Sequence, residues 1–122
     1  QASIQKNIWI IEDDDDGRFG MEQLLQHWGC RVLGFASGEA LQHVLQQSAK
    51  QPDKIIADYQ LINETGLSLV QQIQAHYHMT IPTLIITGTT DPQVSDELTE
   101  NSYESMIKPV KSSDLYRWLA KK

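Results

Sequence analysis

Short apolar runs alternate along this chain with segments whose apolar residues are spaced as on one face of a helix. Residues 6–11 form the first run, and its last four positions are all apolar. A continuous run of this kind is typical of a strand that is buried on both faces of a parallel sheet. Four apolar residues then follow at helical spacing, Met21, Leu24, Leu25 and Trp28, and they predict an amphipathic helix. The pattern therefore predicts one strand followed by one helix.

The same pattern repeats to the end of the chain. We predict four further strands, at residues 31–35, 54–58, 83–87 and 105–107. We predict helices after them, around residues 37–45, 69–77, 92–101 and 115–119. Parallel neighbouring strands need crossover helices, and these helices cover both faces of the sheet. The sequence thus predicts a three-layer α/β/α domain on a five-stranded parallel sheet, in which sites form beyond the carboxyl ends of the strands.

Length and composition fit a globular protein of one domain. The chain has 122 residues, of which 40% are hydrophobic and 21% charged, and a chain of this size forms one core. We expect a single domain over residues 1–122, with its core at about 6–119. No apolar run approaches the ~20 residues that cross a bilayer, so we expect no membrane contact. The single cysteine, Cys30, fits a reducing cytoplasm.

The charge balance is acidic. Asp and Glu number 16 against 10 Lys and Arg, for a formal net charge of −6. Surfaces that bind nucleic acids need Lys and Arg to neutralise phosphates, so we expect no direct binding to nucleic acids. Five of the acids are consecutive, at residues 12–16, and such a run by itself is typical of a solvated stretch.

Polar residues of related chemistry stand at the ends of the predicted strands. Glu12 and Asp13 follow the first strand, Asp58 ends the third, Thr87 ends the fourth, and Lys108 follows the fifth. Carboxylates that converge from separate strands repel one another unless a cation lies among them, and hard oxygen ligands suit Mg²⁺. A lysine and a threonine at the same edge can hold an anionic group whose charge the metal partly neutralises. Together these residues indicate phosphoryl transfer.

Five motifs, by their order and spacing, resemble the receiver domains of two-component response regulators and hybrid histidine kinases. They are the acidic pair within residues 10–14, the phosphoacceptor segment at 52–61, the loop glycine Gly66, the pair Thr87-Gly88 and the pair Lys108-Pro109. The resemblance extends over about residues 6–119. It implies the flavodoxin-like receiver fold with strand order 2-1-3-4-5, and a cis peptide bond between Lys108 and Pro109.

The resemblance also implies a nucleophile and a metal site. Asp58 is the expected phosphoacceptor, which takes a phosphoryl group from a phosphohistidine and forms an aspartyl phosphate. Mg²⁺ is the expected cofactor. Asp13 is expected to bind it directly and Glu12 through water, with Asp58 and the backbone carbonyl of Gln60 completing the protein ligands.

The remaining roles concern the phosphoryl group and the partner. The resemblance implies that Thr87 donates a hydrogen bond to one phosphoryl oxygen and that Lys108 pairs with another. Positioning and charge neutralisation carry most of such catalysis, so no general base is required. The expected partner is a histidine kinase or a histidine phosphotransfer domain, and the expected state is a monomer or weak dimer in the bacterial cytoplasm.

Some features depart from the commonest pattern of the family. Ile62 stands where many receivers have proline, and Ser105 stands where many have a switch tyrosine or phenylalanine. The loop at residues 59–67 resembles that of receivers attached to hybrid kinases, and we expect no output domain after Lys122. We therefore expect a receiver from a hybrid kinase or a phosphorelay rather than a complete transcription factor, with a stand-alone receiver as the alternative that stays open. Because the Ser105 side chain can bury little apolar area, we also expect a muted response to phosphorylation of the face made by the helix at 92–101, the strand at 105–107 and the helix at 115–119.

Other functions explain the same residues less well. The acidic run with Gly17 superficially matches a calcium EF-hand loop, but its twelfth position is Gln23 and a strand precedes it. A flavin- or nucleotide-binding protein needs a glycine- and hydroxyl-rich loop after the first strand to bind phosphate. This chain has five carboxylates there, which would repel the phosphate. A magnesium phosphohydrolase commonly carries a second Asp two residues after the nucleophile, where this chain has Gln60. The alternative that stays open is a degenerate receiver that binds proteins without being phosphorylated.

Overall fold

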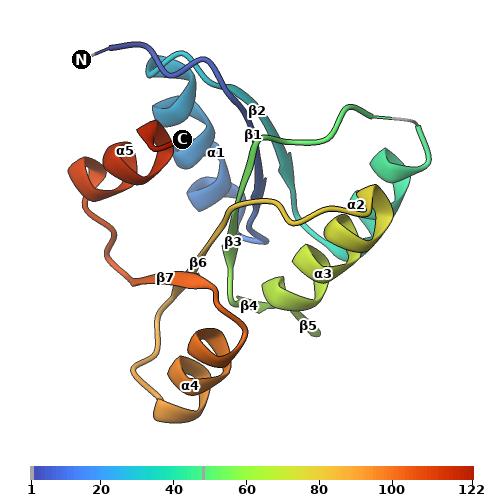
Figure 1. The fold of residues 1–122 in the computed structure, drawn as a ribbon, viewed down its shortest axis with the longest axis vertical. Helices are drawn as coiled ribbons and strands as arrows, with labels where there is room; N and C mark the ends of the chain where they lie inside the picture. The colour runs from blue at the N-terminus through green and yellow to red at the C-terminus, as the bar shows by residue number, and fades with distance from the viewer. Residues whose placement is uncertain (1, 48) are drawn as a thin grey trace.

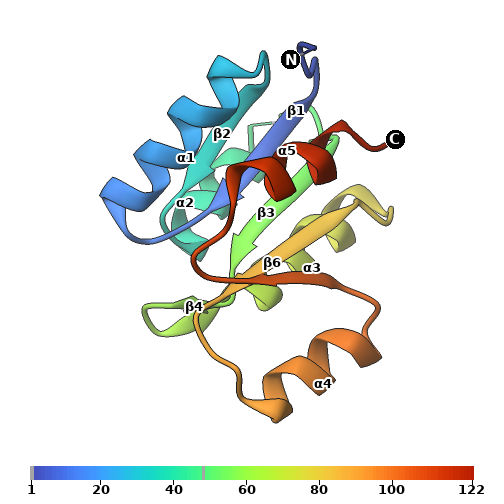
Figure 2. The same ribbon diagram turned by 90° about the vertical axis from the view of Figure 1, so that its left-hand side faces the viewer.

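The computed structural model describes residues 2–47 and 49–122. Within them, the main sheet has five strands, all parallel, in the order β2-β1-β3-β6-β7 (Figures 1 and 2). They are β1 (Asn7–Ile11), β2 (Arg31–Phe35), β3 (Lys54–Asp58), β6 (Thr83–Thr87) and β7 (Glu104–Ile107). Counted among themselves along the chain, these strands have the order 2-1-3-4-5, which confirms the expected flavodoxin-like arrangement.

The central strands are apolar on both faces because both faces pack against helices. In β1, Ile8 and Ile10 belong to one hydrophobic core, and Trp9 and Ile11 belong to the other. None of these four side chains is more than 2% exposed. Burial on both sides is the physical reason for the continuous apolar run in the sequence.

The described residues form five helices in two outer layers. They are α1 (Asp15–His27), α2 (Gly38–Leu45), α3 (Gly66–Tyr77), α4 (Pro92–Glu100) and α5 (Ser112–Ala120). Side chains of α1 and α5 share the core of Ile8 and Ile10, whereas those of α2, α3 and α4 share the core of Trp9 and Ile11. In the part of the chain that the structure describes, no helix has both the length and the apolar character to span a membrane.

Helix α1 begins inside the acidic run, before the apolar stripe that predicted it. The Asp14 carboxylate accepts a hydrogen bond from the Gly17 amide at 2.7 Å and so caps the helix. Asp15 and Asp16 lie in the first turn, where carboxylates interact favourably with the helix dipole. A strand precedes the run and a helix starts within it, so these residues do not have the helix-loop-helix form of an EF-hand.

The segment after β3, which we expected to be a plain loop, contains a small hairpin. β4 (Gln60–Leu61) pairs antiparallel with β5 (Glu64–Thr65), and Asn63 in the turn has a positive φ of 66°. Strands of two residues are too short to produce a periodic pattern of hydrophobicity. The hairpin brings the chain back to the end of β3, beside the residues described next.

Candidate functional site

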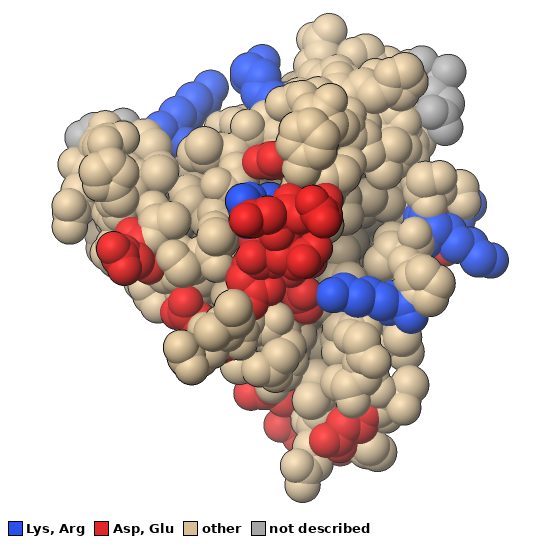
Figure 3. Space-filling view, turned by 180° about the vertical axis from the view of Figure 1, so that it is seen from behind, with Lys and Arg blue, Asp and Glu red and all other residues tan. Residues whose placement is uncertain are grey.

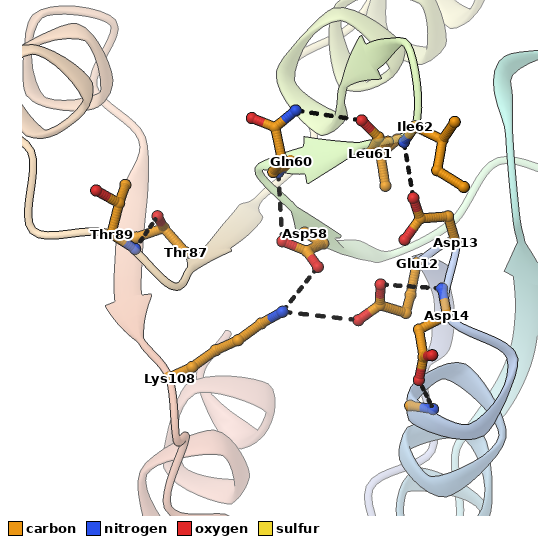
Figure 4. A network of polar contacts seen from close by, with 11 residues as sticks. Glu12, Asp13, Asp14, Asp58, Gln60, Leu61, Ile62, Thr87, Thr89 and Lys108 are labelled. Carbon is orange, nitrogen blue, oxygen red and sulfur yellow. Dashed lines mark hydrogen bonds and ion pairs between the residues drawn. The ribbon is translucent and has the colours of Figure 1, made fainter.

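Five candidate residues gather at the carboxyl edge of the sheet (Figure 4). Glu12 and Asp13 follow β1, Asp58 ends β3, Thr87 ends β6, and Lys108 follows β7. β1 and β3 are neighbours at the centre of the sheet, with β2 on one side and β6 on the other. The strand order reverses there, which is where open α/β sheets bind their ligands. The structure therefore brings together the side chains that the sequence indicated.

Three carboxylates lie at the centre of this group. Glu12, Asp13 and Asp58 each offer an oxygen, and these oxygens lie within 4.8 Å of one another. Burial, and next the negative charge of Asp58, raise the pKa of Glu12 to about 7. Figure 3 shows Asp and Glu side chains gathered in one patch on a face of the molecule, with few Lys or Arg among them. The cluster carries more negative charge than its protein surroundings neutralise, and its hard oxygen donors suit Mg²⁺.

Lys108 supplies the positive charge closest to this cluster among the ion pairs of the described residues. Its Nζ lies 2.8 Å from Asp58 Oδ2 and 4.0 Å from Glu12 Oε1. The hydrogen bond to Asp58 raises the pKa of Lys108, with further contributions from the charges of Asp58 and Glu12. The peptide bond that follows, to Pro109, is cis as expected. Lys108 therefore stays charged, with its ammonium group against the candidate phosphoacceptor.

The acidic run is divided between the site and the helix that follows it. Asp13 Oδ2 accepts a hydrogen bond from the Ile62 amide at 2.7 Å, which joins the site to the β4-β5 hairpin. Asp14 caps α1, as described above, and Asp15 pairs with Arg18 at 2.7 Å. Only Glu12 and Asp13 of this run belong to the carboxylate group around Asp58. The other acids have local roles in the helix.

Asp58 is held at the end of β3 and is only 8% exposed. Its Oδ1 accepts a hydrogen bond from the Gln60 amide at 3.3 Å, while its Oδ2 contacts Lys108. The Gln60 side chain donates to the Leu61 carbonyl instead of turning toward the carboxylates. The role of the Gln60 backbone carbonyl as a metal ligand stays a prediction.

Gly66 is required beside Asp58 for a steric reason. A Cβ atom at this position would lie 1.9 Å from the Asp58 carbonyl oxygen, far inside van der Waals contact. The Gly66 amide also donates to the Tyr59 carbonyl at 2.9 Å. The close approach of these two backbone segments explains the loop glycine that the sequence motif contained.

Thr87 lies at the same edge but is engaged within its own loop. The residue is 6% exposed, and its hydroxyl oxygen accepts a hydrogen bond from the Thr89 amide at 3.1 Å. The Lys108 amide donates to the Thr87 carbonyl at 2.9 Å, so these two residues are adjacent across the β6-β7 pair. The predicted contact of Thr87 with a phosphoryl oxygen stays a prediction.

A cavity of about 210 Å³ adjoins the carboxylates. Its polar lining comes from Glu12, Asp58 and Lys108, and its apolar lining includes Ile56 and Met21. An apolar wall on one side of ionised groups lowers the local polarity, which strengthens the interactions between charges. The arrangement can hold a divalent cation and a small anion side by side.

One residue beside the site is not among those that the sequence indicated. Tyr59 follows Asp58 directly, and its hydroxyl donates to Glu97 Oε1 of α4 at 2.7 Å. Nothing in the sequence marks this pair except the position of Tyr59 next to the candidate phosphoacceptor. Ser105, which stands where many receivers have an aromatic residue, is exposed on β7.

Comparisons with known proteins identify the family and the fold. The family model described as "Response regulator receiver domain" matches residues 8–120. The DNA-binding transcriptional regulator NtrC of Klebsiella pneumoniae is 32% identical over 89 residues, which cover 72% of this chain and 18% of that protein. The chain thus spans about a fifth of the length of this relative.

Solved structures show the same fold. A response regulator receiver domain protein from Clostridium thermocellum matches with a TM-score of 0.78 and 23% identity, over 93% of this chain and 90% of that chain. The receiver domain of the hybrid histidine kinase CckA matches with a TM-score of 0.71 and 24% identity, over 91% and 93%.

Proposed function

The chain belongs to the response regulator receiver domain family, and from this membership we propose that it accepts a phosphoryl group from a phosphohistidine onto Asp58 in a Mg²⁺-dependent reaction. One observation carries the proposal. Asp58 is buried at the end of the central strand, 2.8 Å from the Lys108 ammonium and grouped with two other carboxylates. A nucleophilic carboxylate, a cation site and a fixed positive charge are the parts that transfer of a phosphoryl group to an aspartate needs.

The residues present fit a bound Mg²⁺. Asp13 and Asp58 would bind the ion directly, together with the Gln60 carbonyl, and Glu12 would bind it through water. The raised pKa of Glu12 supports this assignment, because a cation among the carboxylates would remove the repulsion that helps to raise it. When bound, Mg²⁺ neutralises charge on the phosphoryl oxygens.

The protein groups contribute position and charge to the transfer. A carboxylate oxygen of Asp58 forms a bond to phosphorus while the bond from phosphorus to the histidine nitrogen breaks, and that nitrogen keeps the electron pair. Lys108 already lies against Asp58, and its flexible stem allows the ammonium to pair with a phosphoryl oxygen. Thr87 donates a hydrogen bond to another oxygen through its hydroxyl hydrogen, which the bond accepted from the Thr89 amide leaves free. No group has to remove a proton from the carboxylate nucleophile.

The partner in this proposal is a histidine kinase or a histidine phosphotransfer domain, in the cytoplasm. Exposed Ser105 and the loop after Asp58 favour a receiver from a hybrid kinase or a phosphorelay. The chain has the same fold as the receiver domain of a hybrid kinase, which is compatible with this context.

Incubation with acetyl phosphate and Mg²⁺, followed by mass spectrometry, tests the proposal. We expect one acid-labile phosphoryl group on Asp58 of the wild type and none on Asp58→Asn, because Asn is nearly isosteric but a much poorer nucleophile. Asp16→Asn is the matched control, since Asp16 is exposed in the first turn of α1, and we expect it to be phosphorylated like the wild type.

Two outcomes would contradict the proposal. Phosphate at wild-type stoichiometry in Asp58→Asn would remove Asp58 as the acceptor. A folded wild type that takes up no phosphate with Mg²⁺ and the donor present would instead favour the degenerate receiver that only binds proteins.

A further inference from the structure

Tyr59 connects the end of β3 to helix α4. Its hydroxyl donates to Glu97 Oε1 at 2.7 Å, across 38 positions in the sequence. This hydrogen bond is the first cause of the raised pKa of the Tyr59 phenol, so the hydroxyl keeps the proton that it donates. The backbone of Tyr59 also contacts the sheet and the hairpin, because its amide donates to the Ile86 carbonyl at 2.8 Å and its carbonyl accepts from the Gly66 amide.

Helix α4 has few other attachments to the body of the domain. Leu98 is its one buried residue among those described, and Val94 is half-buried against the same core. The other positions of the helix are exposed. Figures 1 and 2 place α4 at one end of the molecule. The charge-assisted hydrogen bond from Tyr59 therefore adds to a small set of contacts that hold this helix.

Tyr59 lies between two groups that take part in the proposed chemistry. Asp58 precedes it, and the amide of Gln60, which follows it, donates to Asp58 Oδ1 at 3.3 Å. A phosphoryl group on Asp58 replaces the present contacts of that carboxylate with Gln60 and Lys108. Any resulting rotation of the backbone between Asp58 and Gln60 turns the Tyr59 side chain, and the bond to Glu97 carries the change into α4.

A second set of hydrogen bonds runs from the same edge of the sheet to the start of α4. The Thr89 amide donates to the Thr87 hydroxyl at 3.1 Å, the Asp91 amide donates to the Thr89 hydroxyl at 3.0 Å, and the Gln93 amide donates to Asp91 Oδ1 at 2.9 Å. Asp91 is the N-cap of α4. If the Thr87 side chain rotates as its hydroxyl donates to a phosphoryl group, the acceptor oxygen of the first of these bonds moves with it. Both routes end on α4, so this helix would be an exception to the muted response that we expect of its face, whereas Ser105 of β7 is exposed.

We propose that Tyr59 transmits the state of Asp58 to helix α4 through its hydrogen bond to Glu97. The inference rests on the proposed phosphoacceptor role of Asp58. It makes Tyr59 a positioning residue and α4 the element whose stability and position report phosphorylation.

The first test needs neither metal nor phosphate. Tyr59→Phe keeps the ring and removes the hydroxyl, so amide hydrogen exchange in α4 should become about threefold to tenfold faster in the unmodified domain. Tyr77→Phe is the matched control, because it also removes a hydroxyl hydrogen bond, to the Ala49 carbonyl at 2.8 Å. The control should leave exchange in α4 unchanged. Equal exchange in α4 of Tyr59→Phe and the wild type would overturn the inference.

The second test uses beryllofluoride, a phosphoryl mimic, with Mg²⁺. In the wild type we expect amide shifts at residues 58–61 and in α4, with smaller shifts over residues 104–118. In Tyr59→Phe the shifts in α4 should fall by about half or more, while those at 58–61 stay. Glu97→Ala should have the same effect, and Glu97→Gln, which keeps an acceptor oxygen, should retain most of the response.

The outcomes separate this inference from the proposed function. If the mimic causes no shifts in α4 of the wild type, or if these shifts persist in Tyr59→Phe, the inference is overturned even though the site binds the mimic. Unchanged amides at residues 58–61 of the wild type would count against the proposed function, and the exchange experiment would then decide by itself whether Tyr59 holds α4.

Discussion

The two ends of β3 each bury a charged side chain, but in opposite surroundings. At the carboxyl end, Asp58 is 8% exposed and lies among other carboxylates beside a cavity. At the amino end, Lys54 is 4% exposed, donates a hydrogen bond to the Trp118 carbonyl, and lies 4.6 Å from the centre of the Trp118 ring. Burial lowers the pKa of Lys54 to about 8 and raises the pKa of Glu12 to about 7. Burial thus disfavours the charge of Lys54 at one end and that of Glu12, which lies beside Asp58, at the other.

The difference lies in how each end can relieve that cost. The Lys54 ammonium contacts two protein groups, the backbone carbonyl and the aromatic face of Trp118, and both belong to α5. The carboxylates at the other end repel one another and adjoin open space. Burial of a charge is therefore not what marks the candidate site. Its mark is a surplus of like charges that an added cation can neutralise.

The largest effect is expected where β3 meets the hairpin. Gly66→Ala should lower the free energy of unfolding by about 3 kcal/mol, because the new Cβ would lie 1.9 Å from the Asp58 carbonyl oxygen and the backbone must move. Urea denaturation measures the change. Gly20→Ala is the control, since no atom lies within 4 Å of its added Cβ, and in the α1 helix it should stabilise the protein by about 0.5–1 kcal/mol. Similar stability of Gly66→Ala and the wild type would show that this end of β3 is not tightly packed.

Next in size is the effect of the buried lysine. At pH 7 Lys54→Met should be neutral or stabilising by about 1–2 kcal/mol, because it replaces a buried charge by an apolar side chain of similar length. A lysine whose folded pKa is about 8, below its unfolded value, destabilises the fold fully below pH 8. That cost disappears as the pH rises toward the unfolded value. The wild type should therefore gain stability relative to Lys54→Met between pH 8 and 10.

Denaturation of both proteins at pH 7 and pH 9.5 checks this prediction. Lys50→Met, at an exposed position before β3, is the control and should show no such pH dependence. If Lys54→Met lowers the free energy of unfolding by more than about 2 kcal/mol at pH 7, the contacts of Lys54 with Trp118 outweigh the cost of burying its charge.

A smaller effect concerns the metal. Asp13→Ala should weaken Mg²⁺ binding about tenfold, because Asp13 contributes one of the three clustered oxygens. Titration followed by amide shifts measures the affinity. Asp14→Ala is the matched variant from the same run, and it should leave the affinity close to that of the wild type while weakening the cap of α1. If Asp13→Ala binds Mg²⁺ normally, another acid of the run is the ligand.

The smallest expected effect is a pH dependence at the carboxylate end. The folded pKa of Glu12 is raised from 4.5 to about 7, so its charged form destabilises the fold. In metal-free buffer the wild type should therefore lose about 1 kcal/mol of stability relative to Glu12→Gln as the pH rises from 5 to 8, since solvent screening at the half-buried Glu12 reduces the roughly 3 kcal/mol that the full shift gives. Mg²⁺ should remove this loss. Asp58→Asn should reduce it and raise the melting temperature without metal, because the charge of Asp58 is the second cause of the shift. A flat difference between wild type and Glu12→Gln over this range would show that neither burial nor repulsion raises the pKa of Glu12.

The sequence by itself determined the order and type of the main-sheet strands and of the helices. Continuous apolar runs identified the central strands β1, β3 and β6 because burial on both faces favours apolar side chains, whereas the edge strands β2 and β7 are partly exposed. Apolar residues at helical spacing identified the helices for a similar reason. The polar residues at the strand ends could also be placed at one edge, since parallel strands end on the same side of a sheet. The parallel sheet and its order are confirmed, whereas the ligand role of the Gln60 carbonyl stays a prediction.

Only the tertiary structure decided what depends on distance between remote residues. The bond from Tyr59 to Glu97 and the bond from Lys54 to the Trp118 carbonyl join residues 38 and 64 positions apart, and no local pattern records such contacts. The start of α1 within the acidic run and the β4-β5 hairpin also escaped the sequence, because a cap and a two-residue strand have no hydrophobic period. The pKa of Glu12 depends on burial and on the charge of Asp58 from another strand. These are properties of the assembled edge of the sheet, and they arise only when the strands come together.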